Sequence, residues 1–447
     1  MTQFSKLEIP AAAHFMIRNA RVLDCFLDTA IAGTNLDNDG AGLLDVTLVD
    51  GKIAALVPSS DNPPQGVPTI DLQGRHLWPT LIDMHTHIDK GQISGRLPPH
   101  SGPFAGARQA INTDRKTNWS RDDIYHRMDF ALRCAYVHGV SAIRTHIDSY
   151  EGLAEDSWEA FKKIRDVWQG RILLQAVASV PIDVYRSAYG VRLADLVAAA
   201  GGLLGGVTRS SQQDAASLLP DLDELLDLIL KLAGDRGLGV DLHVDETGDP
   251  GAASLERVAQ ASMRNRFKGP IVCGHCCSLS VQPEELVRRT LDRCADAGIA
   301  IVTMPVVNMY LHDREPGRTP RWRGATLAHE IRHAGIPLAV GSDNCRDPFH
   351  PYGDYDMFDT FRQAVRVQHL DHTLFDAPSL VGPTPGQIIE ASPLGMIRPG
   401  SDARLIIFNA RSLNELMCRP QSDRIVLDRA KRVTDSLPDF AELDIAR

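Results

Sequence analysis

Short apolar segments alternate with amphipathic helical stretches through the middle of the chain, and this alternation predicts an α/β fold. Polar side chains recur where the apolar segments end, as in barrels whose functional residues gather at the carboxyl ends of the strands. Both ends of the chain contain short strand-like segments with tight turns. We therefore predict a (β/α)8 TIM-like barrel with a small β-sandwich domain built from both termini.

The two ends of the chain predict the β-sandwich. Residues 15–23 and 46–57 alternate or run apolar, and the pair Asp50-Gly51 is a strong signal for a tight hairpin. Residues 400–410 again contain a turn that leads into an apolar strand. We expect residues 1–76 and 385–447 to form the sandwich together, and residues 77–384 to form the barrel.

The middle of the chain repeats one unit, in which a short apolar strand opens near glycine, ends on a polar residue and precedes a helical stretch. We expect eight strands, at 77–87, 139–148, 171–180, 202–208, 237–246, 270–278, 298–308 and 336–344. Helices are expected between them, for example at 122–138, 222–233, 283–297 and 357–367. An open doubly wound sheet is the alternative, but its glycine-rich phosphate loop is not present in the sequence.

Residues 88–120 interrupt this pattern, because they contain glycine and proline and show no clear periodicity. Connections of this length in compact domains are usually functional or disordered. We therefore expect a long loop in this segment, and we interpret it as a lid over the mouth of the barrel.

Composition and charge narrow the kinds of molecule that we expect the protein to bind. Of the 447 residues, 43% are hydrophobic and 23% are charged, which is ordinary for a globular protein. The net charge is −10 and no long basic run occurs, which disfavours a nucleic-acid polymer or an anionic membrane surface as partner. We expect a free, nucleobase-like small molecule as substrate, and the sequence leaves a homo-oligomer open.

The sequence also predicts a cytoplasmic location. Residues 1–10 lack the basic start and apolar stretch of a secretory signal. No window of about 18 apolar residues predicts a membrane span. The eight cysteines are scattered through the chain, apart from a group at Cys273, Cys276 and Cys277. This usage is typical of reduced thiols and not of a disulfide framework.

Two histidines one residue apart, His85 and His87, form the most informative motif. On an extended strand residues i and i+2 point to the same face, so the two imidazoles project together and can hold one metal ion. His243 and Asp343 follow later, each at the end of an apolar run. Three imidazoles and a carboxylate suit Zn²⁺ or Fe²⁺ better than Mg²⁺ or Ca²⁺. We predict one divalent metal ion, Fe²⁺ or Zn²⁺, with Asp343 binding it weakly, taking a proton from water, or both.

Two further side chains at strand ends complete a predicted hydrolytic site. Glu246 lies beyond the strand of His243, where its carboxylate can face a substrate and act as a proton shuttle. His275 ends the sixth predicted strand. It can bind the metal, orient the attacking water or stabilise the developing oxyanion. We favour the last two roles, because four ligands are already assigned.

Two other features leave alternatives open. His146 ends the second predicted strand, and it either binds substrate or pairs with Asp148. Cys273 and Cys276 form a Cys-x-x-Cys pair, which marks a redox centre in some proteins, so a redox protein is the alternative class. Cys273 lies inside an apolar run, and we therefore interpret these cysteines as buried small side chains. Cys273 and Cys277 are also competing soft ligands for the metal.

Taken together, the motifs resemble the amidohydrolase superfamily, and within it the bacterial cytosine deaminase branch. The resemblance spans nearly the whole chain. It rests on His-Thr-His-Ile-Asp at 85–89, Arg-Thr-His-Ile-Asp at 144–148, Leu-Gln-Ala-Val-Ala at 174–178, Asp-Leu-His-Val-Asp-Glu at 241–246, Gly-His at 274–275, Val-Val-Asn-Met-Tyr-Leu at 306–311 and Gly-Ser-Asp-Asn-Cys-Arg-Asp-Pro-Phe at 341–349.

This resemblance implies a barrel capped by a β-sandwich, with one Fe²⁺ or Zn²⁺. The family's metal ligands match four positions in this chain, namely His85, His87, His243 and Asp343. Glu246 matches the proton-transfer acid of the family, and His275 matches the histidine beside the attacking water. Gln175 matches the amide that holds the pyrimidine edge, since glutamine supplies both a donor and an acceptor. Phe349 matches an aromatic residue that lines the ring pocket.

One position departs from the cytosine-specific pattern, because Asn344 stands where those members have a second aspartate. This change removes a charge near the ring and favours 5-substituted cytosines such as 5-methylcytosine. The pairs at 343–344 and 89–90 also resemble relatives that remove alkylamines from triazine rings, but those relatives lack the glutamate found at 246. We predict a metal-dependent deaminase of a free cytosine-type aminopyrimidine that releases ammonia. The alternative is removal of an amine or alkylamine from a triazine, a pterin or isoguanine.

Overall fold

The computed structural model of the protein describes residues 4, 7–61, 65–97, 104–208 and 218–444. The chain divides into two compact units. The first contains the described residues within 1–82, 135–142 and 356–437, and the second contains those within 83–134, 143–355 and 438–447. The domain boundaries expected from the sequence, after residues 76 and 384, stay a prediction.

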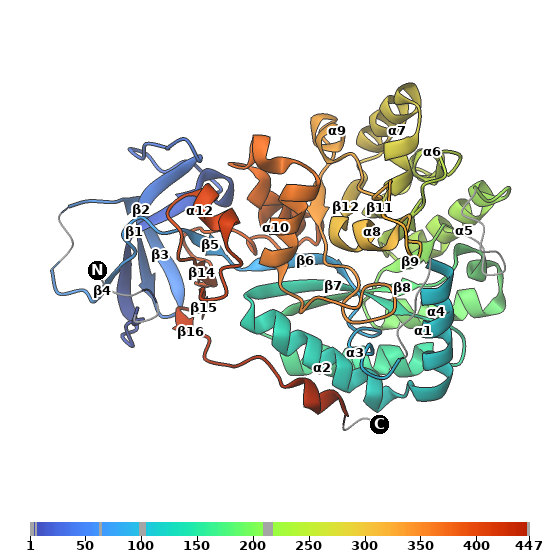
Figure 1. The fold of residues 1–447 in the computed structure, drawn as a ribbon, viewed down its shortest axis with the longest axis horizontal. Coiled ribbons are helices and arrows are strands. Elements are labelled where there is room, and N and C mark those ends of the chain that lie inside the picture. Colours follow the sequence, from blue (N-terminus) through green and yellow to red (C-terminus); the bar gives the residue numbers. More distant parts are fainter. Residues whose placement is uncertain (1–3, 5–6, 62–64, 98–103, 209–217, 445–447) are drawn as a thin grey trace. The chain divides into compact units, whose positions relative to one another are not determined.

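The first unit contains two four-stranded β-sheets (Figure 1). One has the order β3-β2-β1-β4, formed by His14–Leu23 (β1), Ala41–Val49 (β2), Lys52–Pro58 (β3) and Thr69–Asp71 (β4). The other has the order β16-β15-β14-β5, formed by Leu77–Pro79 (β5), Leu405–Ile407 (β14), Ile425–Asp428 (β15) and Lys431–Arg432 (β16). Because the second sheet joins a strand from the first part of the chain to three from the last part, the predicted sandwich from both termini is confirmed.

A cluster of aromatic side chains fills the core of this unit. Trp78 in β5 is fully buried, and four rings surround it edge-on, with centroids between 5.1 and 6.0 Å away. These rings belong to Phe26, Phe358, Phe361 and Phe408. Aromatic pairs in this geometry stabilise a core beyond the area they bury.

The predicted hairpin joins β2 to β3 in an antiparallel pair. Its two central residues, Asp50 and Gly51, have positive φ angles of 48° and 80°. A two-residue turn of this type needs positive φ at both positions, which glycine adopts at no steric cost and aspartate tolerates. The sequence pair therefore determines the turn.

The barrel contains eight strands among the described residues, namely Leu81–Thr86 (β6), Val140–Asp148 (β7), Leu173–Ser179 (β8), Leu204–Val207 (β9), Val240–Val244 (β10), Ile271–His275 (β11), Ala300–Thr303 (β12) and Leu338–Val340 (β13). They form two sheets, β6-β7-β8 and β9-β10-β11-β12-β13. Parallel bridges between Val177 and Leu203 and between Thr86 and Asp343 connect these sheets into a closed barrel. The predicted (β/α)8 fold is confirmed.

Helices lie around the outside of these strands (Figure 1). They are Phe104–Asn118 (α1), Arg121–Val137 (α2), Ala154–Trp168 (α3), Ala188–Ala199 (α4), Leu222–Gly234 (α5), Ser254–Asn265 (α6), Glu284–Asp296 (α7), Pro305–Leu311 (α8) and Ala328–His333 (α9). Met357–Val367 (α10), Pro383–Ile388 (α11) and Leu413–Cys418 (α12) belong to the first unit. Within the described ranges, no helix combines the length and hydropathy needed to cross a membrane.

Strands β9 to β13 pair in parallel, so their carboxyl ends meet at one mouth of the barrel. Gly205 in β9 lies where neighbouring strands approach closely. A Cβ atom there would lie 2.4 Å from the carbonyl oxygen of Ala178 and 2.6 Å from that of Asp241. Only glycine therefore fits this position, and the close approach helps to close the barrel.

Three predicted elements differ from the structure. The strand expected at 77–87 is two strands, since β5 pairs with β14 while β6 belongs to the barrel. The strand expected at 298–308 stops at Thr303, because Pro305 is well suited to the first turn of a helix and starts α8. The loop expected at 88–120 contains helix α1. Residues 98–103 lie outside the described residues, and the lid stays a prediction.

Candidate active site

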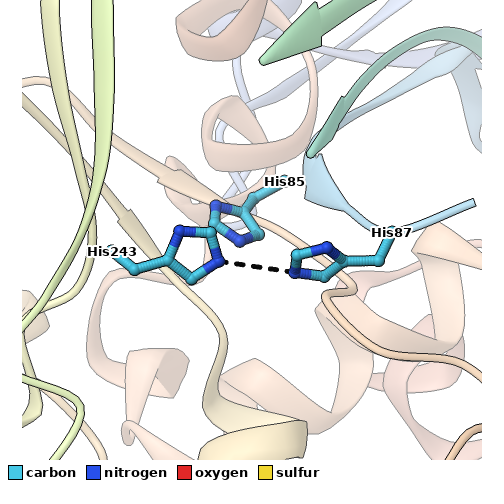
Figure 2. A group of neighbouring side chains, drawn as sticks. All are labelled: His85, His87 and His243. Carbon is cyan, nitrogen blue, oxygen red and sulfur yellow. Dashed lines mark hydrogen bonds between the residues drawn. The ribbon is translucent and has the colours of Figure 1, made fainter. Parts of the chain in front are cut away.

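Three imidazole rings meet at the mouth of the barrel (Figure 2). His85 lies in β6, His87 directly follows that strand, and His243 lies in β10. Nε2 of His243 lies 3.4 Å from Nε2 of His87. The ring centroid of His85 lies 5.5 Å from that of His87 and 4.6 Å from that of His243. All three side chains are buried, and the structure brings together the histidines that the sequence predicted as metal ligands.

Asp343 adds a carboxylate to this cluster. Its Oδ1 lies 3.3 Å from Nε2 of His87 and 3.9 Å from Nε2 of His85. Its backbone N–H donates to the carbonyl oxygen of His85 at 2.8 Å, and its own carbonyl accepts from the Thr86 hydroxyl at 2.8 Å. The φ angle of Asp343 is +63°, an uncommon value for a residue other than glycine. Aspartate adopts this region more readily than most residues, and the two hydrogen bonds to the Asp343 backbone hold it there.

The hydrogen-bonding pattern of the cluster fits a bound cation. Nδ1 of His87 lies 3.0 Å from the carbonyl oxygen of His146. Because a carbonyl only accepts, Nδ1 carries the proton and Nε2 directs its lone pair into the cluster. Among the described residues, both ring nitrogens of His85 and both carboxylate oxygens of Asp343 are buried without a hydrogen-bond partner. Such atoms are rare, and a divalent ion of the Zn²⁺ or Fe²⁺ type would satisfy them.

The protonation states of these groups suit metal binding. Burial lowers the pKa of His85 and of His243 well below the usual range, and neighbouring histidines lower it further. Burial alone would raise the pKa of Asp343, but the contact with His87 and the nearby positive charge of Lys90 help to outweigh burial and lower it. Neutral imidazoles and an ionised carboxylate are the forms that bind a metal.

Glu246 and His275 lie beside this cluster. Glu246 comes two residues after β10, and His275 is the last residue of β11. Nδ1 of His275 lies 3.7 Å from Oε1 of Glu246. Asn308 in α8 places its side-chain nitrogen 3.1 Å from the same Nδ1. A carboxylate and an imidazole at this distance can both hydrogen-bond to one reacting group or exchange protons with it.

A cavity of about 170 Å³ opens onto these side chains, which is a size suited to a small molecule. The predicted site residues that line it are His87, His243, Glu246, His275, Asp343, Asn344 and Phe349. The rest of the lining consists of Lys90, Arg108, Ile111, Asn112, Arg115, Asp148, Tyr150, Ser179, Pro181 and Val207. Polar and charged groups from β7 and α1 therefore line the same cavity as the histidine–aspartate cluster.

Lys90 is a buried cation in the cavity wall. Its Nζ lies 3.8 Å from Oδ1 of Asp148 and 5.1 Å from the ring centroid of Phe349. Burial would lower the pKa of Lys90, but the carboxylates of Asp148 and Asp347 outweigh burial and raise it. These carboxylates therefore favour the charged ammonium form of Lys90 in the cavity wall. Asp148 is shared, because Arg115 from α1 forms an ion pair with it as well.

Two predicted substrate-binding residues are not in the cavity lining. Gln175 was expected to hold a pyrimidine edge, but its Oε1 accepts from Nε and Nη2 of Arg144 at 3.0 and 2.8 Å. His146 stacks on His85, with ring centroids 3.8 Å apart, and its Nε2 lies 3.8 Å from Asp241. Neither side chain lines the cavity, and the roles of both toward a substrate stay predictions.

Asn344 and Phe349 do line the cavity, as expected from the sequence. The amide of Asn344 donates to Oδ2 of Asp347 at 2.6 Å. Asp347 in turn accepts from the backbone N–H groups of Phe349 and His350 at 2.8 and 3.0 Å. Asn344 therefore holds the loop that carries the aromatic ring, and its role toward a substrate stays a prediction.

The sequence prediction missed the residues from α1 and β7 that complete the cavity. Arg108, Asn112 and Arg115 repeat at helical spacing, which is the signal that could have revealed α1 in the expected loop. Lys90 directly follows the motif at 85–89, and Asp148 is the last residue of the motif at 144–148. Their approach across the cavity depends on the packing of β6 beside β7, which no spacing in the sequence predicts.

The cysteine pair has no feature of a redox centre. Cys273 and Cys276 are fully buried free thiols. Burial raises the pKa of each well above the usual range, whereas redox-active cysteines have a lowered pKa and some exposure. Among the described residues, no group that could hold a metal contains a cysteine. The interpretation as buried small side chains therefore fits better than thiol redox chemistry.

Gly341 follows the last residue of β13 and lies against His85 of β6, beside the histidine–aspartate cluster. A Cβ atom at this position would lie 2.8 Å from both Cβ and the carbonyl oxygen of His85. We expect Gly341→Ala to lower the free energy of unfolding by about 1–3 kcal/mol, because the added methyl overpacks the joint, and to weaken zinc binding. Urea unfolding and zinc titration would measure both effects. Gly234→Ala is the control, since the nearest atom to its Cβ lies 3.9 Å away; equal stability and zinc affinity in the two variants would contradict the prediction.

Comparison with known proteins agrees with this geometry. The family model described as "Amidohydrolase family" matches residues 138–434. The chain is also 45% identical over 442 residues to pterin deaminase from Rhizobium rhizogenes, covering 99% of this chain and 98% of the relative. The chain belongs to the amidohydrolase family. As an amidohydrolase it is a hydrolase acting on C–N bonds, and the superfamily binds metal, in agreement with the histidine cluster.

Solved structures of amidohydrolases share the fold. The 5-methylcytosine deaminase from Klebsiella pneumoniae superposes with a TM-score of 0.79 at 20% identity, covering 95% of this chain and 98% of that one. The N-isopropylammelide isopropylaminohydrolase from Burkholderia multivorans has a TM-score of 0.73 at 25% identity, covering 94% and 98%. At such identities the likeness concerns the barrel and not the ring that each enzyme accepts.

Proposed function

We propose that this amidohydrolase deaminates a free N-heterocycle of the pterin class and releases ammonia. The observation that carries the proposal is the identity of 45% with a pterin deaminase along nearly the full length of both chains. Pterin is one of the alternative rings that the sequence allowed. The cytosine-type ring preferred from the sequence has weaker support, because the likeness to 5-methylcytosine deaminase rests on 20% identity.

The reaction replaces a C–N bond by a C–O bond. Water adds to the ring carbon that carries the amino group, and the amine leaves as ammonia once it is protonated. Glu246 takes one proton from the water and delivers it to the neighbouring ring nitrogen, beside the cavity that it lines. The second proton, from the hydroxyl that the water leaves on the ring carbon, passes to the amine, so that C=O forms as the C–N bond breaks and ammonia leaves. His275 and Asp343 orient the water, since both line the same part of the cavity.

The metal ligands in this proposal are His85, His87, His243 and Asp343. A divalent ion held by them supplies a positive charge that makes water a competent nucleophile near neutral pH. The protein's own contribution is to fix the geometry, because the backbone of Asp343 is hydrogen-bonded to His85 and Thr86. His87 is oriented in the same way by the carbonyl of His146.

Lys90 and Phe349 supply the ring-binding surface. The Phe349 ring lines the cavity and offers an apolar face to a flat heterocycle. Lys90 has donors and no acceptor, so it favours a ring oxygen or an unprotonated ring nitrogen over an amino group. A pterin carries an oxygen on its pyrimidine ring, next to a ring nitrogen. This oxygen can accept a hydrogen bond from Lys90.

An ammonia-release assay tests the proposal. Zinc-loaded and iron-loaded protein would be incubated with pterin, cytosine, 5-methylcytosine, isoguanine and an alkylaminotriazine. We expect pterin to give the highest kcat/KM. Faster turnover of cytosine or 5-methylcytosine would support the pyrimidine prediction instead, and release of an alkylamine from the triazine would favour the dealkylating alternative. Absence of ammonia from every ring would contradict deamination altogether.

A further inference from the structure

Asn308 contacts both His275 and Glu246, the two side chains that are proposed to act on the substrate. Its Nδ2 lies 3.1 Å from Nδ1 of His275 and 3.5 Å from Oε1 of Glu246. The residue is 2% exposed and lies outside the cavity lining. It therefore does not reach a substrate and acts only through its two neighbours.

We propose that Asn308 is a positioning residue, which holds His275 in a single tautomer and keeps Glu246 beside it. The inference rests on the proposed deamination, because it concerns the same two groups. It also selects among the roles that the sequence left open for His275.

The two contacts determine which atom of the amide faces the site. A carboxylate of Glu246 only accepts hydrogen bonds, so the amide atom within its reach is the nitrogen. The two hydrogens of this nitrogen can serve separate acceptors, Oε1 of Glu246 and Nδ1 of His275. Nδ1 then accepts this hydrogen bond, which leaves the ring proton on Nε2.

The other nitrogen of His275 is the one left for the chemistry. Nε2 is buried and has no hydrogen-bond partner among the described residues. The ring centroid lies 5.4 Å from that of His85 and 5.0 Å from that of His243. An Nε2–H group can donate to the attacking water, or to the oxyanion that this water becomes during the reaction. It has no lone pair with which to bind a metal. The tautomer thus favours orientation of water over metal binding.

The helix that carries Asn308 makes its amide rigid. Helix α8 starts at Pro305, with only Met304 between it and the end of strand β12, so its first turn lies close to the barrel wall. The backbone N–H of Asn308 donates to the carbonyl of Met304 at 3.0 Å, and its carbonyl accepts from His312 at 3.0 Å. A donor fixed at both backbone ends can hold a ring in one state with little entropic cost.

Replacement of Asn308 by aspartate tests the proposal with almost no change of shape. A carboxylate accepts, so it favours a proton on Nδ1 of His275. We expect the proton of His275 to lie on Nε2 in the wild type and on Nδ1 in Asn308→Asp. ¹⁵N spectra of the two histidine-labelled, zinc-loaded proteins would show this difference. The signal lost in His275→Gln identifies the ring. Asn265→Asp is the matched control, because Asn265 lies on the outer surface of α6 and its spectrum should match wild type.

Kinetics give the second measurement. We expect Asn308→Asp and the shape-matched Asn308→Leu to lower kcat by about 10–100-fold, as is usual when a group that orients an active histidine is lost. KM and zinc content should change little. An unchanged tautomer, or an unchanged kcat, in Asn308→Asp would overturn the proposal. Failure of the wild type to release ammonia would instead contradict the proposed function, because the tautomer is measured in the resting protein.

Discussion

Replacing Glu246 by glutamine should lower kcat by about 10²–10⁴-fold, the contribution that general acid–base catalysis usually makes. Glutamine has nearly the same shape and can still accept from Asn308, which lies 3.5 Å from Oε1 in the wild type. It cannot take a proton from water or pass one to a ring nitrogen. Because Glu246 is not among the side chains grouped around the metal position, zinc content should stay at the wild-type value.

Steady-state ammonia release and metal analysis on the same preparation measure this effect. Glu285→Gln is the matched control, since that residue lies exposed in the first turn of α7 and should leave kcat unchanged. A Glu246→Gln protein that turns over at the wild-type rate would remove Glu246 from the mechanism. Loss of zinc from this variant would show instead that the carboxylate binds the ion.

Replacing His243 by alanine should remove both the metal and the activity. Nε2 of His243 lies 3.4 Å from Nε2 of His87, and an ion between them would lose one of three imidazole ligands. We expect zinc content to fall from about one ion per chain to near zero after dialysis, and ammonia release to fall below detection. Zinc should also no longer raise Tm, because a ligand stabilises a folded protein only if it binds the folded state.

Metal analysis and thermal unfolding with added zinc check the His243→Ala variant. His333→Ala is the control, because His333 is exposed at the end of α9 and lies outside the cavity. It should keep the wild-type zinc content and the rise of Tm. A His243→Ala protein with full zinc content and activity would place the metal elsewhere.

Strand periodicity made much of the candidate site predictable. His85 and His87 lie two residues apart at the end of β6, and His243 lies in β10, so their convergence follows from the closed barrel. The exact ends of elements were less predictable. Pro305 converts the expected continuation of β12 into α8, and that change places Asn308 on a helix beside His275.

The sequence did not predict the contacts of two side chains, Gln175 and His146. The amide of Gln175 was expected to bind substrate. Its oxygen instead accepts hydrogen bonds from Arg144 in the neighbouring strand. His146 stacks against His85 instead of reaching the cavity. Which partner a strand residue meets depends on the stagger between strands, and local spacing carries no information on that stagger.

The sequence by itself determined the barrel and the sandwich from both termini, because these follow from local periodicity. It also singled out the histidine–aspartate set and the glutamate beyond it, as candidates that stand at strand ends. Tertiary structure alone decided that Lys90, Asp148 and helix α1 complete the cavity, and that Asn308 lies within hydrogen-bond distance of His275. These contacts join elements far apart along the chain. Their geometry is set by packing and by the cost of leaving buried polar groups unpaired, and both appear only when the chain has folded.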